Sequence, residues 1–182
     1  PAVTEEDRET LKWIHDLMAE GLVNRDEESV KVLMEALVIV GIAMAFAGSS
    51  RPASGSEHHL SHFFEVTGIV DGTEYFPHGI DVAYSTIETA RLREEILNNP
   101  FPDVQFRPTR EEYMQEMNRL YGSVADGCIA LQDKVGLYEK DMVSIYKAKE
   151  EEIRSILSQM PTAEEIESML AAVNMKMDAF YQ

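Results

Sequence analysis

The sequence predicts an all-α protein. Apolar residues recur at helical spacing along most of the 182 residues, and residue pairs typical of helix starts precede several of these stretches. The alternation of apolar and polar residues that strands require is confined to Val104–Phe106. With 45% apolar residues, the chain is rich enough to fill one core. We therefore expect one helical bundle domain over residues 1–182.

The first half of the chain contains several expected helices. Thr4 is a candidate N-cap for a helix with apolar residues up to Met18. The stretch Val32–Ala47 is the most apolar, but it is shorter than the about 20 residues of a membrane span. We therefore expect a core helix there, buried on most faces. Two further helices are expected from Ser56 to Val66 and from Pro77 to about Leu97.

Capping signals organise the second half. Thr109 and Glu112 form a capping-box pair, which predicts a helix to about Gln132. Another helix is expected over Lys140–Leu157, from its apolar spacing. Thr162 and Glu165 form a second capping-box pair before a last helix to about Val173.

The charge balance excludes some classes of partner. Asp and Glu number 33 against 16 Lys and Arg, a net charge of −17. Such a surface repels nucleic acid and anionic membranes, so any anionic ligand needs a local cationic pocket. The single cysteine, Cys128, fits a reducing compartment, and the acidic N-terminal residues do not resemble a targeting signal. We expect a cytoplasmic protein.

The histidines are the first candidate site. His58 and His62 lie at i and i+4 on an expected helix, and His78 follows 16 residues later at another helix start. Neutral imidazole is a common ligand of zinc and similar ions, so these residues suit a metal site. On spacing alone, ordinary polar residues remain the alternative. Position 59 is His rather than the Glu of zinc peptidases, which argues against that chemistry.

A loop of small residues precedes the histidines. Arg51 is a cation there, and the hydroxyls of Ser50 and Ser54 flank it. Such a loop before a helix suits a phosphate or carboxylate, and a surface arginine in an ordinary loop is the alternative. The chain contains neither a Walker loop nor a glycine-rich dinucleotide motif.

Together these residues resemble a known family. The segment Gly48–His62 reads GSSRPASGSEHHLSH, and Phe76–Gly79 reads FPHG. Both are similar to the sn-glycerol-1-phosphate dehydrogenases, which belong with iron-containing alcohol dehydrogenases, glycerol dehydrogenase and dehydroquinate synthase. The similarity extends over about Val3–Ala90. It implies the helical, C-terminal metal-binding domain of such an enzyme.

The resemblance also implies roles for individual residues. His58 and His78 match the metal ligands, for Zn²⁺ or alternatively Ni²⁺ or Fe²⁺. His62 matches the residue near the substrate that takes part in proton transfer or positioning. We therefore assign it both a catalytic and a substrate-binding role. Ser50, Arg51 and Ser54 match the loop near the substrate phosphate. The metal acts as a Lewis acid while hydride passes to or from the nicotinamide.

The function implied is the interconversion of sn-glycerol 1-phosphate and dihydroxyacetone phosphate, a small phosphorylated substrate. NAD(P) would be bound mainly by an N-terminal nucleotide-binding domain outside this chain, so no cofactor-binding residue is assigned here. The family's Asp ligand also precedes the position matched by Pro1. Without that Asp and that domain, we expect no activity from this chain alone. The resemblance also implies a homo-oligomer, a dimer, as the complete enzyme. The alternative is a non-catalytic helical binding or scaffold module that retains the motif.

Overall fold

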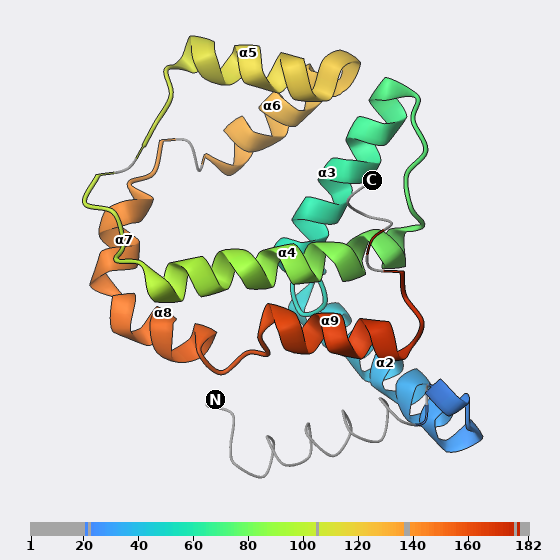
Figure 1. The fold of residues 1–182 in the computed structure, drawn as a ribbon. Coiled ribbons are helices and arrows are strands. Elements are labelled where there is room, and N and C mark those ends of the chain that lie inside the picture. The colour runs from blue at the N-terminus through green and yellow to red at the C-terminus, as the bar shows by residue number, and fades with distance from the viewer. Residues whose placement is uncertain (1–20, 22, 105, 137–138, 177, 179–182) are drawn as a thin grey trace. The chain divides into compact units, whose positions relative to one another are not determined.

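The computed structural model describes residues 21, 23–104, 106–136, 139–176 and 178 (Figure 1). Every regular element within these ranges is a helix, which confirms the predicted all-α class. The chain divides into two compact units, one of Pro1–Ser56 with Glu164–Gln182 and one of Glu57–Ala163. Each unit is described by itself, and a single domain over residues 1–182 stays a prediction. The helix expected from Thr4 to Met18 lies outside the described residues.

Helix α2 (Glu27–Ala47) has well-formed ends. At its start the Asp26 carboxylate accepts a hydrogen bond from the backbone N–H of Ser29 at 2.8 Å and from its hydroxyl at 3.0 Å. At its end Gly48 takes the left-handed conformation with φ 62°, which glycine adopts without strain. Local chemistry therefore defines where α2 begins and ends.

The predicted burial of this helix is wrong. Ser29 is the buried residue of α2, whereas Ile39 is 65% exposed and Phe46 is 89% exposed. The helix is long and apolar enough to cross a membrane by length and composition, a test that core helices also pass. The apolar run was correctly located as a helix, but the described residues of its unit leave most of its apolar side chains exposed.

Helices α3 (Ser56–Asp71) and α4 (His78–Asn98) are joined by a short loop. Gly68 permits the close return of this loop, because a Cβ there would lie 2.9 Å from Cδ1 of Tyr75. Phe76 then packs on Tyr84 with ring centroids 5.4 Å apart. Tyr84 is 2% exposed and Ile87 is fully buried, so α4 carries much of the core of its unit.

Helix α5 (Arg110–Tyr121) begins with the predicted capping box. The Thr109 hydroxyl accepts from the Glu112 backbone N–H, and the Glu112 carboxylate accepts from the Thr109 backbone N–H. The single helix expected to Gln132 is in fact interrupted at Gly122, whose φ is 47°. There the short 3₁₀ helix η1 (Gly122–Val124) turns the chain into α6 (Ala125–Val135), which packs on α5.

The helix expected over residues 140–157 is also divided. It forms α7 (Met142–Ala148) and α8 (Glu150–Leu157), which meet at Lys149. Arg154 of α8 donates to the backbone carbonyls of Ile96, Leu97 and Asn99 at 2.7, 2.9 and 2.6 Å. These bonds join α8 to the C-terminal end of α4, on which it packs (Figure 1). The last helix, α9, covers Ala163–Ala172.

Candidate metal centre

Helix α3 presents three polar side chains along one face. His58, His62 and Glu65 lie at i, i+4 and i+7, positions that project from the same side of a helix. His78 reaches this face from the first residue of α4. The carbonyl of Pro77 accepts from the backbone N–H of Ile80 at 2.8 Å, so the helix begins directly at His78. The sequence thus places four candidate groups at the α3–α4 corner.

The three predicted histidines do come together there, and we call His58, His62 and His78 the histidine cluster. The ring centroids of His62 and His78 lie 5.2 Å apart, with planes only 16° from parallel. The His58 ring lies 5.4 Å from that of His78 and 6.3 Å from that of His62. Residues far apart in the sequence therefore share one small region.

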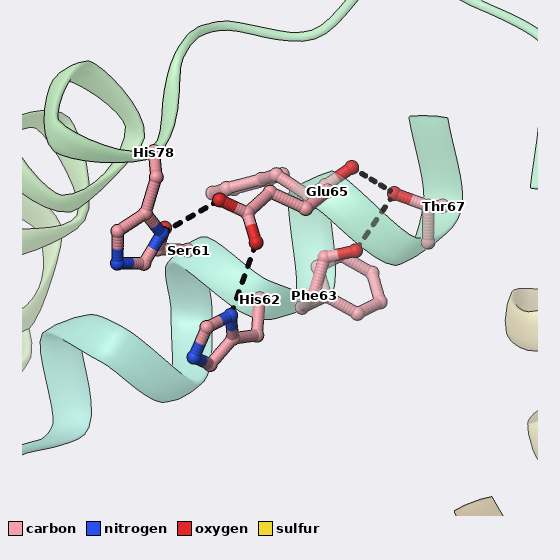
Figure 2. A network of polar contacts seen from close by, with 7 residues as sticks. Ser61, His62, Phe63, Glu65, Thr67 and His78 are labelled. Atoms are coloured by element: carbon pink, nitrogen blue, oxygen red, sulfur yellow. Dashed lines mark hydrogen bonds and ion pairs between the residues drawn. The ribbon is translucent and has the colours of Figure 1, made fainter. Parts of the chain in front are cut away.

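Glu65 connects the rings of His62 and His78. Its Oε2 lies 3.0 Å from Nδ1 of His62 and its Oε1 lies 2.7 Å from Nδ1 of His78, as Figure 2 shows. The buried Ser61 hydroxyl lies 3.5 Å from the same Nδ1 of His78. The Nδ1 of His58 is 2.9 Å from a carboxylate oxygen of Glu57. Every ring of the histidine cluster therefore has a carboxylate at Nδ1.

The charge state of Glu65 follows from its neighbours. Burial raises the pKa of its carboxyl, but the hydrogen bonds and positive charges of His62 and His78 outweigh burial, so that the pKa is lowered overall. Glu65 is therefore ionised at neutral pH and only accepts hydrogen bonds.

A second carboxyl lies deeper in the same corner. Asp81, in the first turn of α4, is 1% exposed, and its Oδ2 has no hydrogen-bond partner among the described residues. The Ser85 hydroxyl, one turn further on, is buried and unpartnered in the same described region. Burial raises the pKa of Asp81, the charge of Glu65 raises it further, and His78 opposes both. The pKa of Asp81 is therefore raised overall above that of an ordinary aspartate.

The donor set fits a divalent metal ion. His62, Glu65 and His78 each offer one donor atom, and these atoms lie within 4.8 Å of one another. Two imidazole nitrogens with one carboxylate oxygen are a donor set that zinc, nickel and ferrous iron accept. The ring of His58, a predicted ligand, lies next to this set. The assignment of His58 and His78 as ligands and His62 as the proton-transfer residue stays a prediction.

Sequence reasoning did not single out Glu65. Its helical spacing from His62, at i+3, and from His58, at i+7, was the available signal. A lone glutamate on an acidic helix is usually a solvated residue, so the signal was weak.

The predicted substrate loop lies in the other unit. Ser50, Arg51 and Ser54 form a turn in which the Ser50 carbonyl accepts from the backbone N–H groups of Ala53 and Ser54, both at 2.9 Å. Ser50 and Arg51 are exposed, and Ser54 is half-buried. Their predicted role toward a substrate phosphate stays a prediction.

Curated glycerol-1-phosphate dehydrogenases [NAD(P)+] are similar to this chain. The enzyme of Geobacillus stearothermophilus is 30% identical over 172 residues, which cover 94% of this chain and 35% of the relative. That of Korarchaeum cryptofilum is 51% identical over 69 residues, 38% of this chain and 22% of the relative. That of Halalkalibacterium halodurans is 42% identical over 67 residues, 37% of this chain and 17% of the relative. No protein-family model matches the chain, and no solved structure matches it significantly.

These similarities bear out the resemblance carried by the Gly48–His62 and Phe76–Gly79 motifs. All three relatives carry the same enzyme name, and the similarity to the Geobacillus stearothermophilus enzyme extends over 94% of this chain. The chain spans only 17–35% of the length of these three relatives. By its sequence, this chain belongs to the glycerol-1-phosphate dehydrogenase family.

Proposed function

We propose that this chain forms the metal-binding part of an NAD(P)-dependent dehydrogenase that interconverts sn-glycerol 1-phosphate and dihydroxyacetone phosphate. The observation that carries the proposal is the histidine cluster with Glu65 at the α3–α4 corner, in a chain of this family. NAD(P) would be held mainly by residues of the enzyme outside this chain. We also propose a homodimer in the cytoplasm that binds neither nucleic acid nor membranes, in keeping with the net charge of −17.

The metal ion would be held by His58 and His78, with Zn²⁺ the first candidate and Ni²⁺ or Fe²⁺ the alternatives. When bound, the ion supplies a Lewis acid at the substrate oxygen that is carbonyl in one direction and hydroxyl in the other. His58 has 22% of its side chain exposed and His78 has 48%, so solvent reaches both side chains. The chain therefore offers imidazoles that solvent, and with it an ion, can reach.

His62 is the residue proposed for proton transfer. Its side chain is 59% exposed, the most open of the histidine cluster. In the oxidation of glycerol 1-phosphate, bound NAD(P)+ would supply the hydride acceptor for the C2 hydrogen, and Nε2 of His62 would accept the proton of the C2 hydroxyl. In the reverse direction Nε2 returns that proton to the oxygen. Oε2 of Glu65 lies 3.0 Å from Nδ1 of the same ring, so Nε2 is the nitrogen left for the substrate.

The substrate phosphate is assigned to the loop that carries Arg51. An anion approaching a chain with a net charge of −17 needs a local cation, and guanidinium binds phosphate through paired N–H groups. Ser50 and Ser54 offer hydroxyl donors on the same turn. This assignment predicts that Arg51 acts on phosphorylated substrates in particular.

A zinc titration of the chain against a competing chelator tests the metal centre. We expect His58→Ala and His78→Ala each to weaken zinc binding by more than the roughly 10–100-fold that loss of an outer-shell partner costs. The matched control is His59→Ala, because His59 is exposed on the same helix and, among the described residues, its ring takes no part in the ring contacts of the cluster. Equal zinc affinity in all of these proteins would contradict the ligand assignment.

Activity is tested in a chimera, the Geobacillus stearothermophilus enzyme in which this chain replaces the matching segment. We expect NAD(P)H-dependent reduction of dihydroxyacetone phosphate that disappears in His78→Ala. Arg51→Ala should raise KM for this substrate more than for unphosphorylated dihydroxyacetone. A chimera that folds and binds zinc but does not turn over would overturn the proposed reaction.

The exposure of α2 favours a second candidate function, a non-catalytic binding module that retains the family motif. An apolar helix of 21 residues with only Ser29 buried resembles a surface that receives a partner. The zinc titration separates the two functions. A dehydrogenase domain should bind zinc and lose that binding in His78→Ala, whereas a module that performs no chemistry has no need to bind zinc through His78.

A further inference from the structure

Glu65 is the feature of the corner that the proposed function leaves unexplained. Its carboxylate lies between a predicted metal ligand, His78, and the predicted proton-transfer residue, His62. It faces Nδ1 of both rings and not Nε2. Only 19% of its side chain is exposed, so it is held in this position rather than extended into solvent.

The distances identify these contacts as hydrogen bonds. Two atoms bound to one tetrahedral zinc ion, each at about 2.0–2.1 Å, lie about 3.4 Å apart. The separations of 2.7 and 3.0 Å between Glu65 and the two Nδ1 atoms are shorter than that and match N–H···O bonds. In this structure Glu65 therefore contacts both imidazoles as a hydrogen-bond acceptor.

An ionised carboxylate has no proton to donate, so each Nδ1 must carry the hydrogen. In a neutral imidazole the other nitrogen, Nε2, then has the free lone pair. In Figure 2 both second ring nitrogens point away from Glu65. Both rings thus present the lone pair of Nε2 on the side opposite the carboxylate. There it can bind a metal ion or accept a proton from the substrate.

We propose that Glu65 is a positioning residue that holds His62 and His78 in the Nδ1–H tautomer, making Nε2 of His78 a metal ligand and Nε2 of His62 a proton acceptor. The roles given to the two Nε2 atoms rest on the proposed function. The assignment of the tautomers rests only on the contacts of Glu65 with the two Nδ1 atoms. The single carboxylate of Glu65 thereby fixes the tautomer of both the metal ligand and the proton acceptor, although the two rings come from different helices.

Nitrogen-15 NMR of the imidazole rings in the metal-free chain tests the tautomers directly. In mildly alkaline solution we expect His62 and His78 to show Nδ1–H and unprotonated Nε2. Glu65→Ala should shift both rings toward the Nε2–H form. Glu65→Gln offers a single acceptor oxygen, so it should retain Nδ1–H in no more than one ring. Unchanged tautomers in Glu65→Ala would overturn the proposal.

Metal binding gives the second readout. Glu65→Ala should weaken zinc binding about 10–100-fold, as loss of a partner behind a ligating histidine does. Glu74→Gln is the charge-matched control, because Glu74 is exposed on the loop between α3 and α4, and its zinc affinity should not change. Circular dichroism of each variant verifies that the helices remain formed.

Cobalt absorption separates a positioning role from ligation. If Glu65 acts through Nδ1, the visible spectrum of the Co²⁺-loaded chain keeps its shape in Glu65→Ala at saturating metal. A changed spectrum would make Glu65 a ligand and overturn the proposal. If the chain binds neither zinc nor cobalt, the proposed function fails, while the metal-free tautomer measurement still decides whether Glu65 positions the rings.

Discussion

Helices α2 and α4 have the same length, 21 residues, and opposite relationships between composition and burial. Helix α2 is mostly apolar, yet Ser29 is its buried residue. Helix α4 carries many charged residues, yet it buries Tyr84 and Ile87 together with Asp81 and Ser85. Apolar character alone therefore did not decide which helix forms the core. Burial depends on which neighbours each helix has to pack against.

The two helices also differ in what holds their ends. Helix α2 begins with a side-chain cap from Asp26 and ends on the left-handed Gly48. Helix α4 begins at His78 after Pro77, which provides no side-chain cap, and the carbonyls at its C-terminal end accept hydrogen bonds from Arg154 of α8. Local signals thus define α2, whereas tertiary contacts hold α4. The site depends on the second kind of helix.

The largest expected effect comes from truncating the core of α4. Ile87→Ala should lower the free energy of unfolding by about 2–5 kcal/mol, because Ile87 is fully buried and the change leaves a cavity. Urea unfolding followed by circular dichroism measures it. The control is Ile39→Ala on α2, where 65% exposure predicts a change within about 0.5 kcal/mol. Equal losses in the two variants would mean that α2 is buried in solution.

A smaller effect is expected at the start of α2. Asp26→Ala removes the acceptor for the Ser29 backbone N–H and should cost about 0.5–2 kcal/mol of stability. Any decrease in the helical circular dichroism signal of this variant should be no larger than the part of the signal that α2 contributes. Zinc affinity is the internal control, because α2 supplies none of the clustered side chains. A variant with wild-type unfolding would show that the helix start does not rest on this cap.

The smallest expected effect is a gain. Asp81→Asn should stabilise the chain by about 1 kcal/mol at neutral pH, because it removes the charge of a buried carboxyl whose Oδ2 has no hydrogen-bond partner among the described residues. Burial, then the charge of Glu65, raises the pKa of Asp81, so the folded state binds more protons than the unfolded state between the ordinary and the raised value. Stability therefore falls as pH rises through that window.

Urea unfolding at two pH values checks this sign. The gain in Asp81→Asn should be present at neutral pH and absent below the ordinary aspartate pKa of about 3.9, where Asp81 is protonated in both states. A gain of equal size at both pH values would show that charge is not its cause.

The sequence anticipated the features that local chemistry decides. The capping box of Thr109 and Glu112 forms as expected, and the helix boundaries near Ser56 and His78 are where the motifs put them. The interruption at Gly122 was missed, because a glycine within a periodic pattern is tolerated in helices and becomes a break only when φ turns positive.

The candidate site shows the same division. The i,i+4 spacing of His58 and His62 predicted their shared face, and His78 joined them as expected. Glu65 could not be distinguished from the other acidic residues of the chain until its distance to the His78 ring was known. A contact across 13 residues depends on how the loop between α3 and α4 returns, which no local pattern encodes.

Arg154 has a consequence for how this unit opens. Its guanidinium binds the carbonyls of Ile96, Leu97 and Asn99 and stacks over the ring of Phe101 at 4.9 Å. Unravelling α8 would withdraw all of these contacts at once, so the last turn of α4 and α8 should fluctuate as one cooperative segment. In amide hydrogen exchange, these two stretches would then share a single opening free energy, although more than fifty residues of chain separate them. The opposite end of α4, where His78 lies, makes none of these contacts with Arg154 and would not take part in that opening.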